Sequence, residues 1–456
     1  MHSASHICAP AVHMLAAGGF FMILLTKWND LLWQWLLPVL LTAAAVLCGI
    51  RQKGKPVIGL MRMLRELFGG LFTSRTDANQ RGIFANALAA AMGTGNLIGT
   101  ALALIHGGAG AIFWMWISAL LGMFLVYAEN VLGIRFRRVH PDGTITGGAL
   151  AYLRYGTGAK LLTAFFAFCC IFAALGMGNM AQSSTIAQSA AYFHMPHAGS
   201  GMLIALLLFV ILRRSPAHAK AFAARLMPLL CGMYLIGCGY LILRNRNALP
   251  HACMEILRGA FGLQAAGCGC TAGILLQSLS IGLRRGIFSN EAGLGSSALL
   301  HMDADSDDPV LQGKWAAAEV FLDTVICCTA TALVILTAPA CQPAAFTDAS
   351  ALLLHAFSAG LGDAASVFLS VSMMLFAFAT MIGWYPCGAA CAGYLFGKNA
   401  CTVYFAAYVL LAFAGALGSP AWIWAFCDCC NGMMALPNLY GLMILSKKSN
   451  SGRFTS

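Results

Sequence analysis

Two glycine-rich segments carry the residues best suited to bind a small ligand. The first is Gly93-Thr-Gly-Asn96, and the second is Arg285-Gly-Ile-Phe-Ser-Asn-Glu-Ala-Gly-Leu-Gly-Ser296. Both interrupt stretches that are otherwise apolar. Glycine lets the backbone unwind, and the exposed N-terminus of a half-helix presents amide hydrogens to an anion such as a carboxylate. Unwound carbonyl oxygens suit Na⁺, so the two segments together predict a site for a zwitterion and a cation.

Close helix packing is the alternative explanation for these glycines, because small residues let membrane helices approach one another. For a single pair such as Gly93 and Gly95 we would prefer that explanation. Backbone polar groups are tolerated unpaired in hydrocarbon only where they face a cavity, an ion or a substrate. Two interrupted stretches at corresponding positions therefore favour a binding site.

Ionisable side chains within apolar stretches are a second indication of function. Each costs about 2.5–3.5 kcal/mol to insert and is expected to be paired or to line a polar cavity. Arg285 and Glu291 lie across the second segment, where an internal ion pair and direct ligand contact are equally compatible with the spacing. Helix capping is the alternative role for Asp323 and Asp428. The predicted structural or gating charges are Glu129, Arg285, Glu291, Asp323 and Asp428.

Thr380 and Trp384 are four residues apart and therefore share one face of a helix. They would supply a hydroxyl and a large apolar wall to a pocket for a small side chain. The alternative is a threonine bonded to its own helix and a tryptophan at the lipid interface. The sequence contains no Ser-His-Asp set, phosphate loop or cluster of histidines that would indicate an enzyme.

The elements that must position these residues are membrane helices. Of the 456 residues, 60% are hydrophobic and 9% are charged, whereas about a quarter are charged in soluble domains. A membrane span needs roughly 20 apolar residues. Eleven such stretches are predicted, at 31–50, 83–105, 110–134, 158–193, 200–213, 225–244, 271–300, 315–338, 362–395, 401–417 and 420–445.

One further apolar stretch, Ala9–Thr26, precedes the first of these spans. It is compatible with a twelfth helix, with a signal-like segment and with an extension from a misplaced start codon. A cleaved signal peptide is the weakest of these readings, because no basic region precedes the apolar run.

The basic residues predict the orientation of the chain. Its net charge is +11, and most of the 27 lysines and arginines lie in alternate short loops between spans. This distribution is typical of a multi-pass protein of the inner or plasma membrane whose C-terminus is cytoplasmic. Because the charges are not gathered on one soluble face, the lipid bilayer is a predicted partner and nucleic acid is not.

The two interrupted stretches, 83–105 and 271–300, lie five spans apart. With an odd number of spans in each half, the second half inserts upside down relative to the first, as in inverted-repeat transporters whose first helix in each half is broken. The predicted organisation is an N-terminal extension at 1–28, an extra transmembrane helix and basic cytoplasmic loop at 29–82, a first five-helix repeat at 83–244, an extracellular loop at 245–270, a second, inverted five-helix repeat at 271–446 and a cytoplasmic tail at 447–456.

Taken together, these motifs resemble the alanine or glycine:cation symporters, which are usually sodium-coupled and belong to the LeuT-like fold group. The resemblance runs from about Asn29 to Lys447. Its specific pieces, besides the two glycine-rich segments, are Gly107-Gly-Ala-Gly-Ala-Ile-Phe-Trp-Met-Trp116, Gly178-Asn-Met180 with Gln182, Asp308-Pro309, Gln312-Gly313, Phe321-Leu-Asp-Thr324, Thr380 with Gly383-Trp384, Tyr394-Leu-Phe-Gly397 and Pro437-Asn-Leu439.

The resemblance implies an all-α polytopic membrane protein with ten core helices in two inverted repeats, an added N-terminal helix and alternating access. It implies an amino-acid site at the first broken helix, with the second broken helix as the opposite wall and the 362–395 helix closing the side-chain pocket. The residues implied in this site are Thr94, Gly95, Asn96, Gln182, Phe288, Ser289, Asn290, Thr380 and Trp384.

The same resemblance implies Na⁺ as the coupling ion, held near Gly93, Asn96 and Thr380, with no other cofactor. The chain departs from the family pattern after Trp384. Where the family usually has Tyr-Tyr-Tyr-Gly-Glu, this sequence has Tyr385-Pro-Cys-Gly-Ala389. The inserted proline and the missing glutamate affect the cytoplasmic end of that helix.

The function expected is import of a small neutral amino acid, alanine or glycine, together with Na⁺. A carrier of the same fold for another solute, or one driven by H⁺, is the main alternative. A membrane sensor that binds an amino acid without transporting it is a second alternative. A monomer suffices for each of these functions, and the sequence leaves the oligomeric state open.

Overall fold

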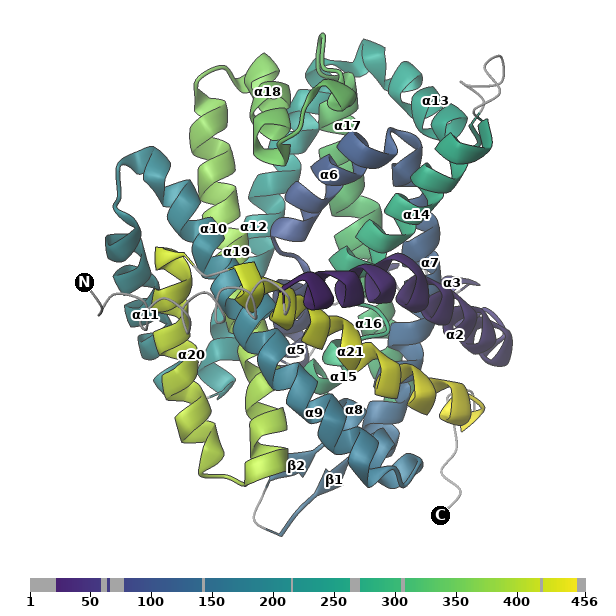
Figure 1. Cartoon of the computed structure of the whole chain (residues 1–456), viewed down its shortest axis with the longest axis vertical. Helices are drawn as coiled ribbons and strands as arrows, with labels where there is room; N and C mark the ends of the chain where they lie inside the picture. Colours follow the sequence, from purple (N-terminus) through teal and green to yellow (C-terminus); the bar gives the residue numbers. More distant parts are fainter. Residues whose placement is uncertain are drawn as a thin grey trace, which may run out of the picture.

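The computed structural model describes residues 22–58, 64–65, 78–141, 144–214, 216–262, 271–304, 308–418 and 421–448. These residues form a helical bundle (Figure 1). The only strands among them are β1 (Arg138–Val139) and β2 (Ile145–Thr146), which pair antiparallel in a small hairpin. The predicted stretch Ala9–Thr26 lies outside the described residues except for Met22–Thr26, which begin the first helix.

The N-terminal part of the chain contains an extra helix and the first predicted repeat. The extra helix covers Met22–Gln52 and includes a π-helical segment, η1 (Leu32–Leu36). The elements that follow η1 are α2 (Leu37–Gln52), α3 (Lys55–Ile58), α5 (Ala78–Ala91), η2 (Thr94–Asn96), α6 (Ile98–Gly107), α7 (Gly110–Arg135), α8 (Gly148–Ala151), η3 (Tyr152–Gly156), α9 (Lys160–Leu175), η4 (Gly176–Met180), α10 (Ala181–Ala190), η5 (Ala191–Phe193), α11 (His197–Arg214) and α12 (Pro216–Arg244).

The C-terminal part contains the second predicted repeat. Its elements are η6 (Arg246–Ala248), α13 (Leu249–Ala260), α14 (Thr271–Asn290), α15 (Ser296–Leu300), α16 (Pro309–Val320), η8 (Phe321–Cys328), α17 (Thr329–Thr337), η9 (Pro343–Ala345), α18 (Ala349–Leu361), α19 (Ala364–Phe396), α20 (Ala400–Leu417) and α21 (Ala421–Leu445). In Figure 1, α13 and α18 lie at one end of the bundle and the β1–β2 hairpin lies at the opposite end.

Fewer helices meet the length and hydropathy of a membrane span than the eleven predicted. Among the described residues seven do so singly, and α5 with η2 and α6 form an eighth as a bent pair. The other three predicted spans, 200–213, 271–300 and 420–445, are present as α11, as α14 with α15, and as α21. The apolar part of α11 is short. Polar residues interrupt the other two spans, with Arg284 and Arg285 in α14 and Asp428 and Asn438 in α21.

The outer surface of the bundle suits lipid contact. Large apolar side chains are exposed on helices at its periphery, among them Trp35 beside α2, Leu206 on α11, Leu229 on α12 and Val403 on α20. The interior is rich in buried alanine, which lets helix backbones approach closely. The chain is thus a multi-pass membrane protein by the length, composition and packing of its helices.

Five helix contacts position the candidate site. Helix α7 packs against both α14 and α16, and α9 packs against both α19 and α21. The extra helix lies beside α21 (Figure 1), where Asn29 Nδ2 donates a hydrogen bond of 2.7 Å to the carbonyl of Ala425. The two interrupted helices therefore lie inside the bundle, with the longer helices around them.

Candidate functional site at the two helix breaks

The first break lies between α5 and α6. Helix α5 ends at Ala91, Gly93 is extended, and the short 3₁₀ turn η2 leads into α6 at an angle of 52° between the two halves. A Cβ atom on Gly93 would lie 2.8 Å from Thr380 Oγ1 of α19, so only glycine fits here without a shift. The first amides of a helix have no acceptor within it, so the start of η2 presents N–H groups at the break.

The second break follows α14. The helix continues to Asn290, so the interruption begins at Glu291 rather than nearer Arg285, and α15 resumes at Ser296. Glu291 has a φ of 52° and Gly293 a φ of 85°, both in the left-handed region. That backbone conformation is uncommon for a residue other than glycine. The carboxylate of Glu291 is consequently carried on a turn that the surrounding contacts must hold in place.

Asp323 joins the two breaks. It lies in η8, a π-helical segment that continues α16, and π-helical turns are frequent at functional sites. Asn96 Nδ2 donates to Asp323 Oδ1 at 2.8 Å and to the Asp323 carbonyl at 3.1 Å. Ser289 Oγ donates to Asp323 Oδ2 at 2.8 Å, and Thr324 Oγ1 donates to the same oxygen at 2.9 Å. Three side chains thus compensate the buried carboxylate, and two of them come from the two broken helices.

Thr94 of the first break faces Gln182 of α10. Thr94 Oγ1 lies 3.4 Å from Gln182 Oε1, and Gln182 Nε2 donates to the carbonyl of Met177 at 3.1 Å. Met177 belongs to η4, another π-helical segment. Thr94 is half-buried and Asn96 is buried. The hydroxyl of Thr94 and the amide of Asn96 therefore lie in different surroundings.

Thr380 contacts the first break from α19. Its hydroxyl lies 3.2 Å from the carbonyl of Ala89 near the end of α5 and 3.0 Å from the carbonyl of Phe376 on its own helix. Both the cross-helix contact and the expected local bond are therefore present. Carbonyl and hydroxyl oxygens beside an unwound segment are the ligands that transporters of broken-helix design use for Na⁺. The oxygens near Gly93 and Thr380 fit that donor chemistry.

Trp384 connects α19 to the second break. Its Nε1 donates to Glu291 Oε1 at 3.0 Å, and Ser296 Oγ donates to Glu291 Oε2 at 3.2 Å. The indole is almost fully buried, and a Cβ atom on Gly178 would lie 2.5 Å from Trp384 Cβ and Cγ. Trp384 is thus a buried residue packed against η4, not a residue at the lipid interface.

Two predicted site residues of the second broken helix, Phe288 and Asn290, lie apart from the Asp323 cluster. Phe288 makes an edge contact with Trp33 of the extra helix, with ring centroids 6.1 Å apart. Asn290 Oδ1 accepts a hydrogen bond from the Ala292 amide at 3.1 Å, which stabilises the turn at the second break. Of the residues predicted on the second broken helix, Ser289 is the one that contacts the first break, at Asn96.

The remaining predicted charges take part in contacts outside the Asp323 cluster. Glu129 Oε1 accepts from Asn438 Nδ2 at 2.7 Å, and the same amide donates to the carbonyl of Gly293 at 2.8 Å. Glu291 is bound by Trp384 and Ser296 and forms no ion pair with Arg285. Arg285 instead interacts electrostatically with Asp428 of α21.

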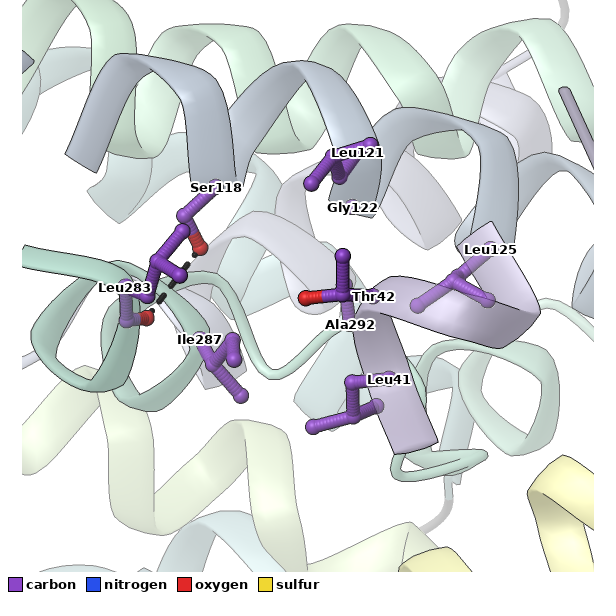
Figure 2. Close-up of a pocket in the computed structure, with 9 residues that line it drawn as sticks. All are labelled: Leu41, Thr42, Ser118, Leu121, Gly122, Leu125, Leu283, Ile287 and Ala292. Atoms are coloured by element: carbon purple, nitrogen blue, oxygen red, sulfur yellow. Dashed lines mark hydrogen bonds between the residues drawn. The ribbon is translucent and has the colours of Figure 1, made fainter. Parts of the chain in front are cut away.

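A narrow apolar crevice lies behind the second break, where the extra helix covers it. Figure 2 shows α2, α7 and α14 meeting there, with Ser118 Oγ donating to the carbonyl of Leu283 at 3.3 Å. The crevice has a volume of about 10 Å³, and side chains from these three helices and from the break line it: Leu41, Thr42, Ser118, Leu121, Gly122, Leu125, Leu283, Ile287 and Ala292. This lining is too apolar for a zwitterion, so the polar side of the breaks is the better candidate site.

Sequence reasoning missed two buried networks beside the site. One is the His301–Glu319 pair, with Nε2 and Oε1 2.9 Å apart. The other contains Asn438, whose Oδ1 accepts a hydrogen bond from Tyr152. The ionisable residues within apolar stretches could have pointed to Glu319, because it lies in a predicted span. No sequence signal indicated that His301 pairs with Glu319, or that Asn438 contacts Tyr152.

Comparison with known proteins gives the family. Residues 19–452 match the sodium:alanine symporter family. The sodium/alanine symporter AgcS of Methanococcus maripaludis is 33% identical, over 93% of this chain and 95% of the relative. Two relatives from Bacillus subtilis are the "Probable sodium/glutamine symporter GlnT", 32% identical over 92% of this chain and 87% of the relative, and the amino-acid carrier protein AlsT, 29% identical over 94% and 90%.

Among solved structures, a manganese transporter of Eremococcus coleocola is 14% identical with a TM-score of 0.46, over 81% of this chain and 75% of that one. The extent of the family match and the identity to AgcS lead to one conclusion. The chain belongs to the sodium:alanine symporter family.

Proposed function

We propose that this protein imports a small neutral amino acid, alanine or glycine, together with Na⁺, by alternating access. The amino acid would bind between the two helix breaks. Family membership supports a sodium-coupled carrier of amino acids. We add to this the choice of alanine or glycine as the substrate and the mechanism that couples it to Na⁺.

One observation carries the proposal above the others. The hydrogen bonds of Asp323 to Asn96 and Ser289 tie both breaks to one buried carboxylate. A ligand that moves either break would therefore act on a carboxylate that the other broken helix also contacts. This mechanical connection is what a carrier needs if a single binding event is to control access from two sides.

The substrate carboxylate would meet the amides at the start of η2, near Gly95 and Asn96; the Asn96 amide itself donates to the Gly93 carbonyl at 3.3 Å. A half-helix N-terminus attracts an anion through its N–H groups and its dipole. Thr94 and Gln182, whose side chains meet at 3.4 Å, would contact the other polar groups of the substrate. The ring of Trp384 would limit the length of the substrate side chain.

The cation would bind on the other side of the first break, among the oxygens near Gly93, Asn96 and Thr380. Na⁺ there would order the unwound backbone, and amino-acid affinity would rise with Na⁺ concentration because the two ligands stabilise the same arrangement. Thr380 Oγ1, close to the Ala89 carbonyl, is the side-chain oxygen that supports this assignment.

We further propose two inverted five-helix repeats, 83–244 and 271–446, with the C-terminus in the cytoplasm. The break in the first helix of each half supports this arrangement. A cavity of about 1140 Å³ opens beside the β1–β2 hairpin and is lined by Tyr385, the neighbour of Trp384, and by Pro386. We assign it as the inward vestibule, so the departure from the family pattern at 385–389 lies in its wall.

Uptake into proteoliposomes tests the proposal. Radiolabelled alanine, glycine or glutamine would be offered under an inward Na⁺ gradient and, separately, under an inward H⁺ gradient. We expect transient accumulation of alanine or glycine above equilibrium under the Na⁺ gradient. Accumulation only under the H⁺ gradient would overturn the assignment of Na⁺ as the coupling ion. A preference for glutamine would overturn the assignment of the substrate, and binding without accumulation would indicate a sensor.

A further inference from the structure

A small cavity beside the breaks is lined by two carboxylates. It lies between α5, α7, α16 and the second break, has a volume of about 10 Å³, and is bordered by Glu291 and Glu319. That volume is room for about one water molecule. A cation or a proton between two carboxylates that border one small cavity would stabilise their ionised forms.

The second carboxylate is part of a buried pair with a histidine. His301 is fully buried at the end of α15, Glu319 is 4% exposed, and His301 Nε2 lies 2.9 Å from Glu319 Oε1. His301 Nδ1 lies 2.9 Å from Gln312 Oε1 on the other side of the ring. An imidazolium donates from both nitrogens, whereas a neutral imidazole donates from only one. Both ring nitrogens of His301 therefore face an oxygen that can accept a hydrogen bond.

A third group points to a ligand in the cavity. Asn290 is 4% exposed and lines the cavity. Its Oδ1 is engaged by the Ala292 amide, while its Nδ2 has no hydrogen-bond partner in the part of the chain that the structure describes. Buried donors in proteins are almost always paired. A water molecule bridging the carboxylates would pair this amide.

Several of the other ionisable groups around the pair have partners of their own. The ionisable groups on the described parts of α15, α16 and the elements packed against them, with Arg137 just after α7, are Lys55, Tyr127, Glu129, Arg135, Arg137, Lys314, Asp323, Cys327, Cys328, Tyr385, Cys387, Cys391 and Tyr394. Asp323 is bound by Asn96 and Ser289, and Glu129 by Asn438. Arg137 donates to the carbonyls of Met302 and Ala304. Glu291 is thus the ionisable group that shares the cavity with Glu319.

We propose that Glu291, Glu319 and His301 form a proton site, and that the proton bound there is linked to amino-acid binding through Trp384. The proton enters from bulk water and returns to it. With His301 protonated and both carboxylates ionised the three groups carry one net negative charge, and one further proton neutralises them.

The link to the amino-acid site runs through one hydrogen bond. Trp384 Nε1 donates to Glu291 Oε1 at 3.0 Å. Protonation of Glu291 would therefore weaken the acceptor that holds the Trp384 ring, and this ring is the one that would close the side-chain pocket. This half of the inference rests on the proposed function. Linkage between two ligands is reciprocal. If the bound amino acid helps to retain the proton, then the bound proton must raise the affinity for the amino acid to the same extent.

Infrared spectroscopy tests the proton site without reference to transport. pH-difference spectra of the purified full-length protein would be compared with those of Glu319→Gln and His301→Gln. We expect a protonated-carboxyl C=O band in the wild type that titrates and that both variants remove or shift. The matched control is Glu255→Gln, since Glu255 belongs to the exposed His251–Glu255 pair on α13, 3.9 Å apart. Unchanged spectra in both folded variants would overturn the site.

Alanine binding at fixed Na⁺ tests the linkage. We expect the apparent Kd for alanine to fall about fivefold from about pH 8 to about pH 6, and this dependence to be lost in Glu319→Gln but kept in Glu255→Gln. Normal Na⁺-driven uptake with no pH dependence would overturn the linkage alone and leave the proposed function intact. Failure of alanine to bind at any pH would overturn the linkage together with the proposed function, while the infrared result would still decide the proton site.

Discussion

Asn96 Nδ2 lies 2.8 Å from Asp323 Oδ1 and 3.1 Å from the Asp323 carbonyl. One amide of the first broken helix is therefore held twice by a residue that also binds Ser289 of the second broken helix. Because the three residues are buried, loss of any one of them leaves a polar partner unsatisfied. The arrangement links the two broken helices through one buried carboxyl group.

Removal of the Asp323 carboxylate is predicted to weaken alanine binding strongly. Hydrogen bonds to a buried charge contribute about 1.5–3 kcal/mol each, so Asp323→Ala should raise the Kd for alanine by roughly tenfold to 100-fold. Asn96→Ala should have a similar effect, and the double variant should be much less than additive because the two residues act together. Binding of radiolabelled alanine in Na⁺ measures all three. Simple additivity would contradict a shared role.

The bulk and the N–H of Trp384 are predicted to have separate effects. Trp384→Ala should let leucine compete with alanine, because the wall of the pocket is lost. Trp384→Phe should keep the preference for alanine while losing the hydrogen bond to Glu291. Competition by leucine in alanine uptake reports the difference. The control is Trp35→Ala, since Trp35 is 70% exposed on the outside of the bundle. An unchanged alanine-to-leucine preference in Trp384→Ala would show that the ring does not line the pocket.

An added methyl group at Gly178 is predicted to displace Trp384. Its Cβ would lie 2.5 Å from Trp384 Cβ and Cγ, and overpacking of this kind costs about 1–3 kcal/mol. Gly178→Ala should therefore lower alanine uptake and the temperature of thermal unfolding. Gly99→Ala on α6 is the matched control, because no atom lies within 4 Å of the added Cβ there. Equal behaviour of the two variants would argue against close packing of η4 on α19.

The hydroxyl of Thr380 is predicted to govern the Na⁺ requirement. Thr380→Val keeps the shape but removes the oxygen, so half-maximal uptake should need roughly tenfold more Na⁺, in line with the loss of one ligand worth about 1.4 kcal/mol. Thr380→Ser should restore the wild-type requirement. Thr337→Val is the control, since the Thr337 hydroxyl is also bonded to its own helix, at Leu333. A Na⁺ dependence that is the same in Thr380→Val and Thr337→Val would remove Thr380 from the cation site.

Native cysteines are predicted to report the orientation of the chain. Cys253 is exposed on α13, and Cys401 is partly exposed in the wall of the 1140 Å³ cavity. A membrane-impermeant maleimide should modify Cys253 in right-side-out vesicles and Cys401 in inverted ones, as peptide mass spectrometry can establish. The reverse pattern would place the C-terminus outside.

Local composition was sufficient to predict the breaks, but not what holds them together. The glycines and polar residues at 93–96 and 285–296 indicated interrupted helices, and both interruptions are present. The second begins only at Glu291, because the preceding residues from Arg285 to Asn290 continue α14. An interrupted pattern marks a region of unwinding and does not fix its first residue.

The contacts between distant residues depend on packing that a single sequence does not contain. Asn96 and Asp323 are 227 residues apart, and Trp384 and Glu291 are 93 apart. The spacing of Arg285 and Glu291 allowed an ion pair that is not formed, because Glu291 turns toward Trp384 and Ser296. Three of the eleven predicted spans are present as helices below the length or hydropathy of a typical membrane span, because α11 is short and α14 and α21 carry polar residues.

The most direct test of the central claim is Na⁺-driven accumulation of alanine by wild-type protein and by Asp323→Ala, reconstituted side by side. Transient accumulation above equilibrium is expected for the wild type under an inward Na⁺ gradient, and none is expected for Asp323→Ala at equal protein content. Wild-type accumulation that Asp323→Ala matches in rate and extent would contradict a site that depends on joining the two breaks. Failure of the wild type to accumulate alanine under the Na⁺ gradient would contradict the proposed transport itself.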